Sequence, residues 1–228
     1  MRRRARTMKN QGFTAEEKVI VTNYIKNAFQ KIDLYRISDD FWSLIISILP
    51  QEILLHIQKT LEKYNETDRE NRRISKKSFK HLPVYKKISK ECIYLEDYEQ
   101  EEIFDIIEKY IYTVKSKNLV LKKVKKLEKI FDLNLEELEI ISFFYLKNAN
   151  EWDFCGYEFD RDQSIENFLN IPNSHIKKLL SHKNTLMYNE IINKDNDFAL
   201  SETMMEYLST DSSSLLNYLC TKEYGANI

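Results

Sequence analysis

The 228-residue chain has only three glycines and three prolines. Glycine supplies the tight turns and the close backbone approach that β-rich folds and nucleotide-binding loops require. The scarcity of glycine therefore favours a mainly helical protein. It also excludes a phosphate-binding loop of the form G-x-x-x-x-G-K-[ST], which occurs nowhere in the chain. We expect this chain to bind no cofactor.

Cysteine is scarce as well. Cys92, Cys155 and Cys220 are odd in number and far apart, so they predict neither a disulfide framework nor a C-x-x-C metal site. Cys and His are not clustered, and the chain has neither a Ser/His/Asp order nor an H-E-x-x-H motif. The sequence therefore predicts no metal site, no catalytic residue and no enzyme activity.

Long apolar runs are missing too. The most apolar stretch, residues 41–49, has about half of the roughly 20 residues that a membrane helix needs. The start, MRRRARTMKN, is basic but has no apolar segment behind it, so it does not resemble a secretory signal. These features predict a soluble protein with no membrane partner, and the few cysteines fit a reducing cytoplasm.

The residues that are present describe a folded chain with an uneven charge. Hydrophobic residues make up 43% and aromatic residues 12%, which is enough for a sizeable core. Residues 1–130 hold 28 Lys and Arg against 19 Asp and Glu, a net charge of +9. Residues 131–228 hold 7 against 17, a net charge of −10. This asymmetry favours two units, or a basic surface that faces an acidic one.

The first part of the chain shows helical periodicity. Thr14 and Glu17 have the spacing of a capping box, and the apolar residues that follow recur at steps of three and four. The expected helices span residues 15–32, 40–49, 51–64 and 95–114. We assign residues 1–64 to an N-terminal helical unit and residues 92–118 to a connecting helix.

Residues 65–91 are strongly basic, with Phe79 and Tyr85 among the Lys and Arg residues. This mixture is one footprint of nucleic-acid binding, because phosphates pair with Lys and Arg while aromatic rings stack on bases. A solvated linker between two helical units explains the same composition, and Pro83 supports a loop here. Both interpretations stay open. Under the first, the candidate contacts are Arg72, Arg73, Lys76 and Lys77.

Residues 119–210 predict a winged-helix-like unit, followed by a tail over 211–228. The expected elements are a helix with five lysines over 119–131, a helix over 135–147 capped by Asn134, short helices over 164–169 and 174–181, a hairpin, and a final helix capped by Ser201. The hairpin is predicted from the run LMYNEIINKDNDFALS, which has alternating apolar residues, a turn at 194–197 and a second strand over 198–200. The predicted fold class is mainly α, with an N-terminal helical unit, a winged-helix-like C-terminal unit and a small β-hairpin.

A winged-helix unit also suggests a place for nucleic acid. Base reading needs exposed polar side chains near the start of the second helix of the pair, with phosphate contacts around them. The candidates here are Asn173, Ser174, Lys177 and Lys178. The charge of −10 on residues 131–228 would repel DNA unless the basic residues 65–91 or the lysines of helix 119–131 lie alongside.

Three runs, LEKIFDLNLEELEIISFFYL, FLNIPNSHIKKLLSHKNTLMYNEII and FALSETMMEYLS, resemble the region just upstream of the ATPase core in a group of bacterial AAA-family ATPases. Those proteins carry a helical N-terminal part with a winged-helix-like module beside the motor. The resemblance is in apolar spacings, such as Phe131 to Asn134, Leu179–Leu180 and Phe198 to Leu208. In that family the nucleotide-binding core would follow this region, whereas this chain has no such core.

Two functions stay open on the sequence. The resemblance implies a non-catalytic protein-interaction or regulatory module, a truncated or split version of such an ATPase, whose partner is an ATPase core or a second copy of this chain. The alternative is a winged-helix transcriptional regulator that binds DNA.

Overall fold

The computed structural model describes residues 13–31, 39–67, 97–150, 161–193 and 198–210, together with Ile88 and Cys92. Two compact units make up the chain, unit 1 over residues 1–118 and unit 2 over residues 119–228. The described part is mainly helical with one small antiparallel sheet, so the predicted mainly α class is confirmed. No helix within it has the length and apolar character needed to cross a bilayer. The predicted linker over 65–91 and the tail over 211–228 lie largely outside the described residues.

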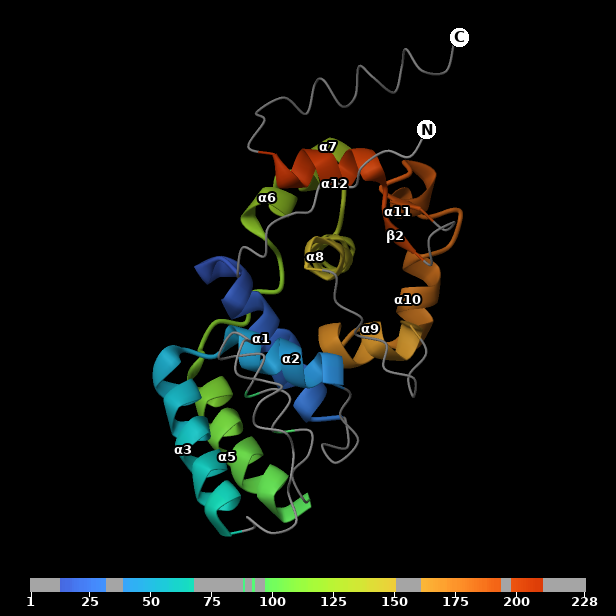
Figure 1. Cartoon of the computed structure of the whole chain (residues 1–228). Coiled ribbons are helices and arrows are strands. Elements are labelled where there is room, and N and C mark those ends of the chain that lie inside the picture. Colours follow the sequence, from blue (N-terminus) through green and yellow to red (C-terminus); the bar gives the residue numbers. More distant parts are fainter. Residues whose placement is uncertain are drawn as a thin grey trace, which may run out of the picture. The chain divides into compact units, whose positions relative to one another are not determined.

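Unit 1 contains helices α1 (Ala15–Phe29), α2 (Asp39–Ile48), α3 (Gln51–Thr67) and α5 (Asp97–Thr113). Each expected helix of this region is confirmed, with ends that differ by at most three residues. The predicted capping box at the start of α1 is present, because Thr14 and Glu17 each accept the other's backbone N–H. Helices α3 and α5 run antiparallel, which brings the Tyr64 hydroxyl within hydrogen-bond reach of the Glu102 carboxylate (Figure 1).

Aromatic rings form the centre of unit 1. The Trp42 side chain is 1% exposed and stacks on Phe104, with ring centres 4.6 Å apart. Phe29 meets Phe41 and Phe104 edge to face at 6.4 and 6.0 Å. Such pairs add about 0.5–1.5 kcal/mol to the burial of the rings themselves. The cluster therefore joins α1, α2 and α5 into one core.

Unit 2 contains α6 (Lys122–Lys125), α7 (Glu128–Phe131), α8 (Leu135–Ala149), α9 (Arg161–Leu169), α10 (Asn173–Leu179), α11 (Thr185–Tyr188), β1 (Ile192–Asn193), β2 (Ala199–Leu200) and α12 (Glu202–Ser209). Figure 1 views α8 along its axis, with α6, α9, α12 and β2 packed around it. Every residue from Ile140 to Leu146 is buried, so α8 is enclosed on all sides. The prediction of an apolar central helix is confirmed.

The prediction of one regular helix over 119–131 is wrong. The backbone tightens between α6 and α7, where the Leu127 N–H donates to the Val124 carbonyl at 2.9 Å, a three-residue step. Leu121, Val124 and Leu127 are all buried against the unit. A turn with three residues per repeat keeps such a three-residue spacing on one face, and this is the physical reason for the tight junction.

The predicted hairpin is present but shorter than expected. Strand β1 pairs antiparallel with β2, and Ile192 lies opposite Leu200. Residues 186–188, expected in the first strand, belong to α11 instead. The reason is a helix cap, since the Asn184 side chain accepts the Leu186 N–H at 2.8 Å. The predicted turn at 194–197 lies outside the described residues.

Candidate interaction surfaces

A short turn joins α9 to α10. It consists of residues 170–172, and Asn170 takes the left-handed conformation there with φ of 58°. A helix pair of this kind often has glycine in its turn, and Asn is one of the few other residues that tolerate the conformation. The Pro172 carbonyl accepts the N–H groups of His175 and Ile176, so α10 begins directly after the turn. The turn and these two backbone hydrogen bonds fix the direction in which α10 leaves α9.

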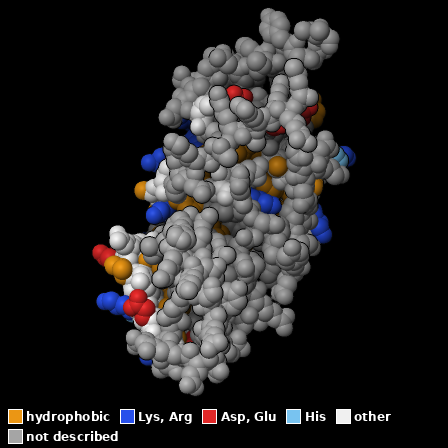
Figure 2. Space-filling model, in the orientation of Figure 1, with side chains coloured by type: hydrophobic (Ala, Val, Ile, Leu, Met, Phe, Trp, Pro, Cys, Tyr) orange, Lys and Arg blue, Asp and Glu red, His pale blue; other side chains and the backbone are white. Residues whose placement is uncertain are grey.

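The predicted nucleic-acid residues of this region lie on α10. Ser174, Lys177 and Lys178 are exposed and share one face at helical spacing. Asn173 is half-buried, and its Oδ1 atom is enclosed without a hydrogen-bond partner. Figure 2 shows Lys and His side chains along the edge that α10 and α11 occupy in Figure 1. The other four candidates, Arg72, Arg73, Lys76 and Lys77, lie outside the described residues.

A carboxylate from α8 lies beside α10. Glu136 pairs with His175, with 3.4 Å between Oε1 and Nδ1, and both side chains are nearly half exposed. One turn further along α8, burial raises the pKa of Glu139 from 4.5 to about 7, and the negative charge of Glu136 adds to the shift. The surroundings of α10 are therefore of mixed charge and not uniformly basic.

A buried carboxylate joins α8 to α11. The Glu137 side chain is 3% exposed. Its Oε2 accepts the Asn134 N–H at 2.8 Å, and its Oε1 accepts the Asn184 side-chain amide at 2.8 Å. Asn184 in turn caps α11. One side chain therefore completes the cap of α8 and holds the start of α11 against it.

Two large apolar side chains are exposed on these joined elements. Tyr188, the last residue of α11, is 80% exposed, and Leu135, the first residue of α8, is 64% exposed. We use the name junction face for four exposed or partly exposed residues of α8, α10 and α11, namely Leu135, the paired Glu136 and His175, and Tyr188. The sequence placed Tyr188 in a strand and gave it no role. The Asn184–Thr185 pair, a possible helix start, was the only local signal for it.

A second surface lies on α6 and α7. Four lysines of these helices and of the turn between them are exposed, namely Lys122, Lys125, Lys126 and Lys129, and we call this set the lysine stripe. Lys123 instead lies over the Tyr145 ring, 3.5 Å from its centre. The buried Leu121 N–H donates to the Ser142 hydroxyl of α8 at 3.1 Å. The stripe therefore rests on a backbone that is anchored to the central helix.

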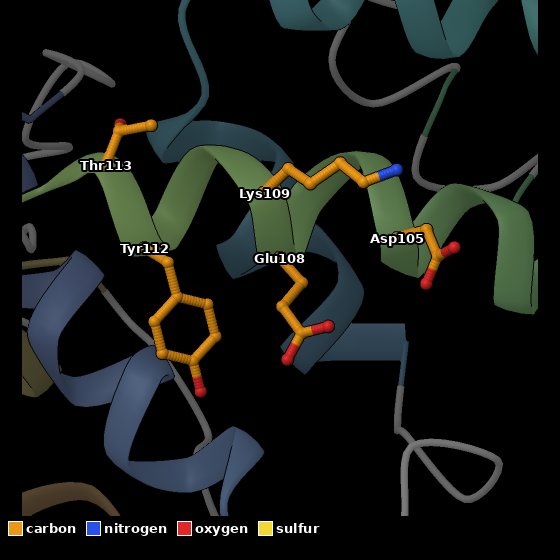
Figure 3. A pocket seen from close by; sticks show the side chains of 5 residues that line it. All are labelled: Asp105, Glu108, Lys109, Tyr112 and Thr113. Atoms are coloured by element: carbon orange, nitrogen blue, oxygen red, sulfur yellow. The ribbon is translucent and has the colours of Figure 1, made fainter.

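Unit 1 offers a weaker candidate. A hollow of about 420 Å³ runs along α5, lined by Asp105, Glu108, Lys109, Tyr112 and Thr113. Figure 3 shows Glu108 and Tyr112 on the same side of α5 and Thr113 pointing away from them. The Lys26 ammonium group of α1 lies over the Tyr112 ring, 4.8 Å from the ring centre. Within the described ranges, no group of three or more His, Cys, Asp or Glu residues is placed to hold a metal ion.

Comparisons of the chain with protein-family models, curated proteins and solved structures find no match. The charge of each unit can be counted directly. Unit 1 holds 23 Lys and Arg against 18 Asp and Glu, a net charge of +5, and unit 2 holds 12 against 18, a net charge of −6. The boundary after residue 118 places the five lysines of residues 122–129 in unit 2. The net charge of unit 2 is therefore less negative than that of residues 131–228.

Proposed function

We propose that this chain is a non-catalytic interaction and regulatory module whose winged-helix-like C-terminal unit binds a partner protein at the junction face. The observation that carries the proposal is the exposure of Tyr188 and Leu135 on elements that a buried hydrogen bond joins. Protein interfaces are centred on aromatic and apolar side chains, with polar groups at the rim. The Glu136–His175 pair supplies such a rim.

The buried carboxylate of Glu137 makes this surface suitable for binding. Its bonds to Asn134 and Asn184 hold the ends of α8 and α11 in place before any partner arrives. A preorganised surface loses less conformational entropy on binding than a mobile one does. Tyr188 also has few rotatable bonds, so ordering its side chain costs little.

The resemblance of residues 127–209 to the region beside an AAA-family ATPase core supports a particular class of partner. We propose that the partner is a motor ATPase, or a second copy of this chain, and that this chain regulates it without hydrolysing nucleotide. The helix pair α9–α10 with the following β1–β2 hairpin supports a winged-helix-like arrangement.

Site-specific photo-crosslinking in the native cell tests the proposal. A benzophenone side chain placed at Tyr188 is expected to trap one protein, identified by mass spectrometry as an AAA-family ATPase or this chain itself. The same group at Leu55 of α3, which is 50% exposed, is the matched control and is expected to trap no discrete product. The purified pair should then bind, and Tyr188→Ser should weaken that binding. Equal labelling from both positions, or no protein adduct from Tyr188, would refute the proposal.

DNA binding is the second candidate function, and the exposed face of α10 favours it. Ser174, Lys177 and Lys178 lie together at the surface, directly after a turn of the length found in DNA-binding helix pairs. A gel-shift series with duplex DNA at rising salt tests it, with Lys177→Gln/Lys178→Gln as the variant. Salt-sensitive binding that the double variant weakens would support this function. No shift at low salt would exclude it.

A further inference from the structure

We propose that the lysine stripe of α6 and α7 is a second contact surface, separate from the junction face, which docks an acidic segment of a partner protein that also carries apolar side chains. The assignment rests on the protein-contact function proposed above and adds the chemistry of the segment that is recognised. Its basis is the arrangement of Lys122, Lys125, Lys126 and Lys129 beside an exposed Ile130.

The stripe is a continuous surface in spite of the tight junction between α6 and α7. Lys126 and Leu127 keep right-handed helical backbone angles, with φ of −63° and −75°. Leu121, Val124 and Leu127 are buried in the core of unit 2, whereas the four lysines between and after them are exposed. The lysines therefore lie on the side of the element that faces away from the core. The ammonium groups therefore gather on one side of the element and repel one another, which favours an anionic partner.

The backbone below the stripe is fixed. Val124 and Leu127 are fully buried, and the Leu121 N–H bonds to Ser142 of α8. Lys123 covers the ring of Tyr145, also on α8. The outward side chains are thus presented by a rigid support, and binding would have to order only the lysines themselves.

Ile130 indicates what kind of anion fits. It is 41% exposed and directly follows Lys129 in α7, so it lies at one end of the stripe. A phosphate backbone offers no apolar group to cover it, whereas an acidic segment with apolar side chains covers both Ile130 and the lysines. Figure 1 also shows α6 and α7 on one side of α8 and α10 on another, so the stripe does not extend the basic face of α10.

A bilayer surface fits the stripe less well. Helices that lie in a membrane interface insert a broad apolar face below their lysines. In α6 and α7 that face consists of Leu121, Val124 and Leu127, which are buried in the core of unit 2. Ile130 and the partly exposed Phe131 would remain for insertion, and two such side chains are too little for stable anchoring.

Fluorescence anisotropy with labelled probes tests the assignment on the full chain. The probes are a helical peptide of Glu and Leu, a poly-Glu peptide of equal length, a DNA duplex, and vesicles that contain phosphatidylserine. We expect the Glu/Leu peptide to bind most tightly, and we expect its binding to weaken as the salt concentration rises. Lys125→Gln/Lys126→Gln/Lys129→Gln should weaken it about tenfold, because each exposed pair contributes a fraction of a kcal/mol. Ile130→Ser should weaken it about threefold, since a partly exposed side chain gains only part of its burial energy.

Matched variants separate the possible outcomes. Lys177→Gln/Lys178→Gln/Lys183→Gln removes the same charge from exposed lysines elsewhere in unit 2, and it should change the affinity less than twofold. Tyr188→Ser should leave peptide binding unchanged, so a failed crosslink at Tyr188 would not affect this result. An equal loss in both triple variants, equal binding of poly-Glu, tighter binding of DNA or vesicles, or no binding at low salt would each overturn the assignment.

Discussion

Each unit has a helix that begins with a capping box, and the two boxes differ in their surroundings. In unit 1 the box of Thr14 and Glu17 lies at the surface. In unit 2 the box of Asn134 and Glu137 contains a buried carboxylate that also holds Asn184, 47 residues away. The same local motif therefore closes a helix end in one unit and joins two elements in the other.

The units also differ in backbone strain. Among the described residues, all positive φ angles belong to unit 2, at Asp132, Asn170, Glu190 and Phe198. The three glycines of the chain lie outside those residues, so other side chains occupy these left-handed positions. Both units have aromatic ring pairs in their cores, and unit 2 also has a buried polar bond and left-handed turn residues beside its exposed surfaces. This contrast is why we locate the function in unit 2.

Glu137→Ala gives the largest expected effect and tests the contrast directly. The change leaves the Asn134 N–H and the Asn184 amide without their acceptor. We expect a loss of about 2–3 kcal/mol in the free energy of unfolding, measured by urea denaturation. The matched change Glu17→Ala in unit 1 should cost about 0.5–1 kcal/mol, because water can replace the lost bond there. Equal losses would show that the two capping boxes contribute equally to stability, which would contradict the contrast.

Asn184→Ala is expected to have the second-largest effect on stability. It removes the amide that donates to Glu137 and the oxygen that caps α11, so we expect a loss of about 1–2 kcal/mol. Hydrogen exchange at the Leu186 N–H should become faster, because its acceptor is gone. Asn184→Ser keeps a capping oxygen and should lose less. If the alanine variant also abolishes crosslinking from Tyr188, the placement of α11 matters for binding as well as for stability.

Glu139→Gln gives a smaller effect that depends on pH. The pKa of Glu139 is raised by burial and by Glu136, so the folded state holds the proton more tightly than the unfolded chain does. Its contribution to stability is complete below about pH 4.5 and is lost as the pH rises towards about 7. The glutamine variant stays neutral throughout. Its free energy of unfolding should equal that of the native chain at pH 4. At pH 8 it should be higher by about 1 kcal/mol, after allowance for solvent screening.

Denaturation curves at several pH values measure this difference. Glu202→Gln, at an exposed position of α12, is the control and should follow the native profile. Parallel profiles for Glu139→Gln and the native chain would contradict the raised pKa.

Local signals predicted much of the fold. The caps at Thr14, Asn134 and Ser201 and the three- and four-residue apolar steps were enough to place most helices. The helix of residues 185–188 was missed because its alternating apolar residues favour a strand, and the cap of Asn184 prevails only in the folded unit. The turn between α6 and α7 was missed because a spacing of three fits both a regular helix and a tighter one.

The candidate surfaces were harder to predict for a different reason. The bond between Glu137 and Asn184 joins residues far apart in sequence, and no local pattern of charge or periodicity reveals it. The sequence did identify Ser174, Lys177 and Lys178 as exposed residues of one helix. It could not show that Glu136 reaches His175 beside them, which depends on how α8 and α10 pack.

Glu190→Gly is expected to have the smallest effect, and it tests the strain in unit 2. Glu190 has φ of 52°, a conformation that costs a non-glycine residue about 1 kcal/mol. Glycine relieves this strain but makes the unfolded chain more flexible, so the net gain should be about 0.5 kcal/mol. Asn170→Gly is the control. It should not raise the stability, because Asn tolerates φ of 58°. Thermal unfolding of both variants measures the difference. A loss in Glu190→Gly would mean that the glutamate side chain contributes more than its backbone strain costs.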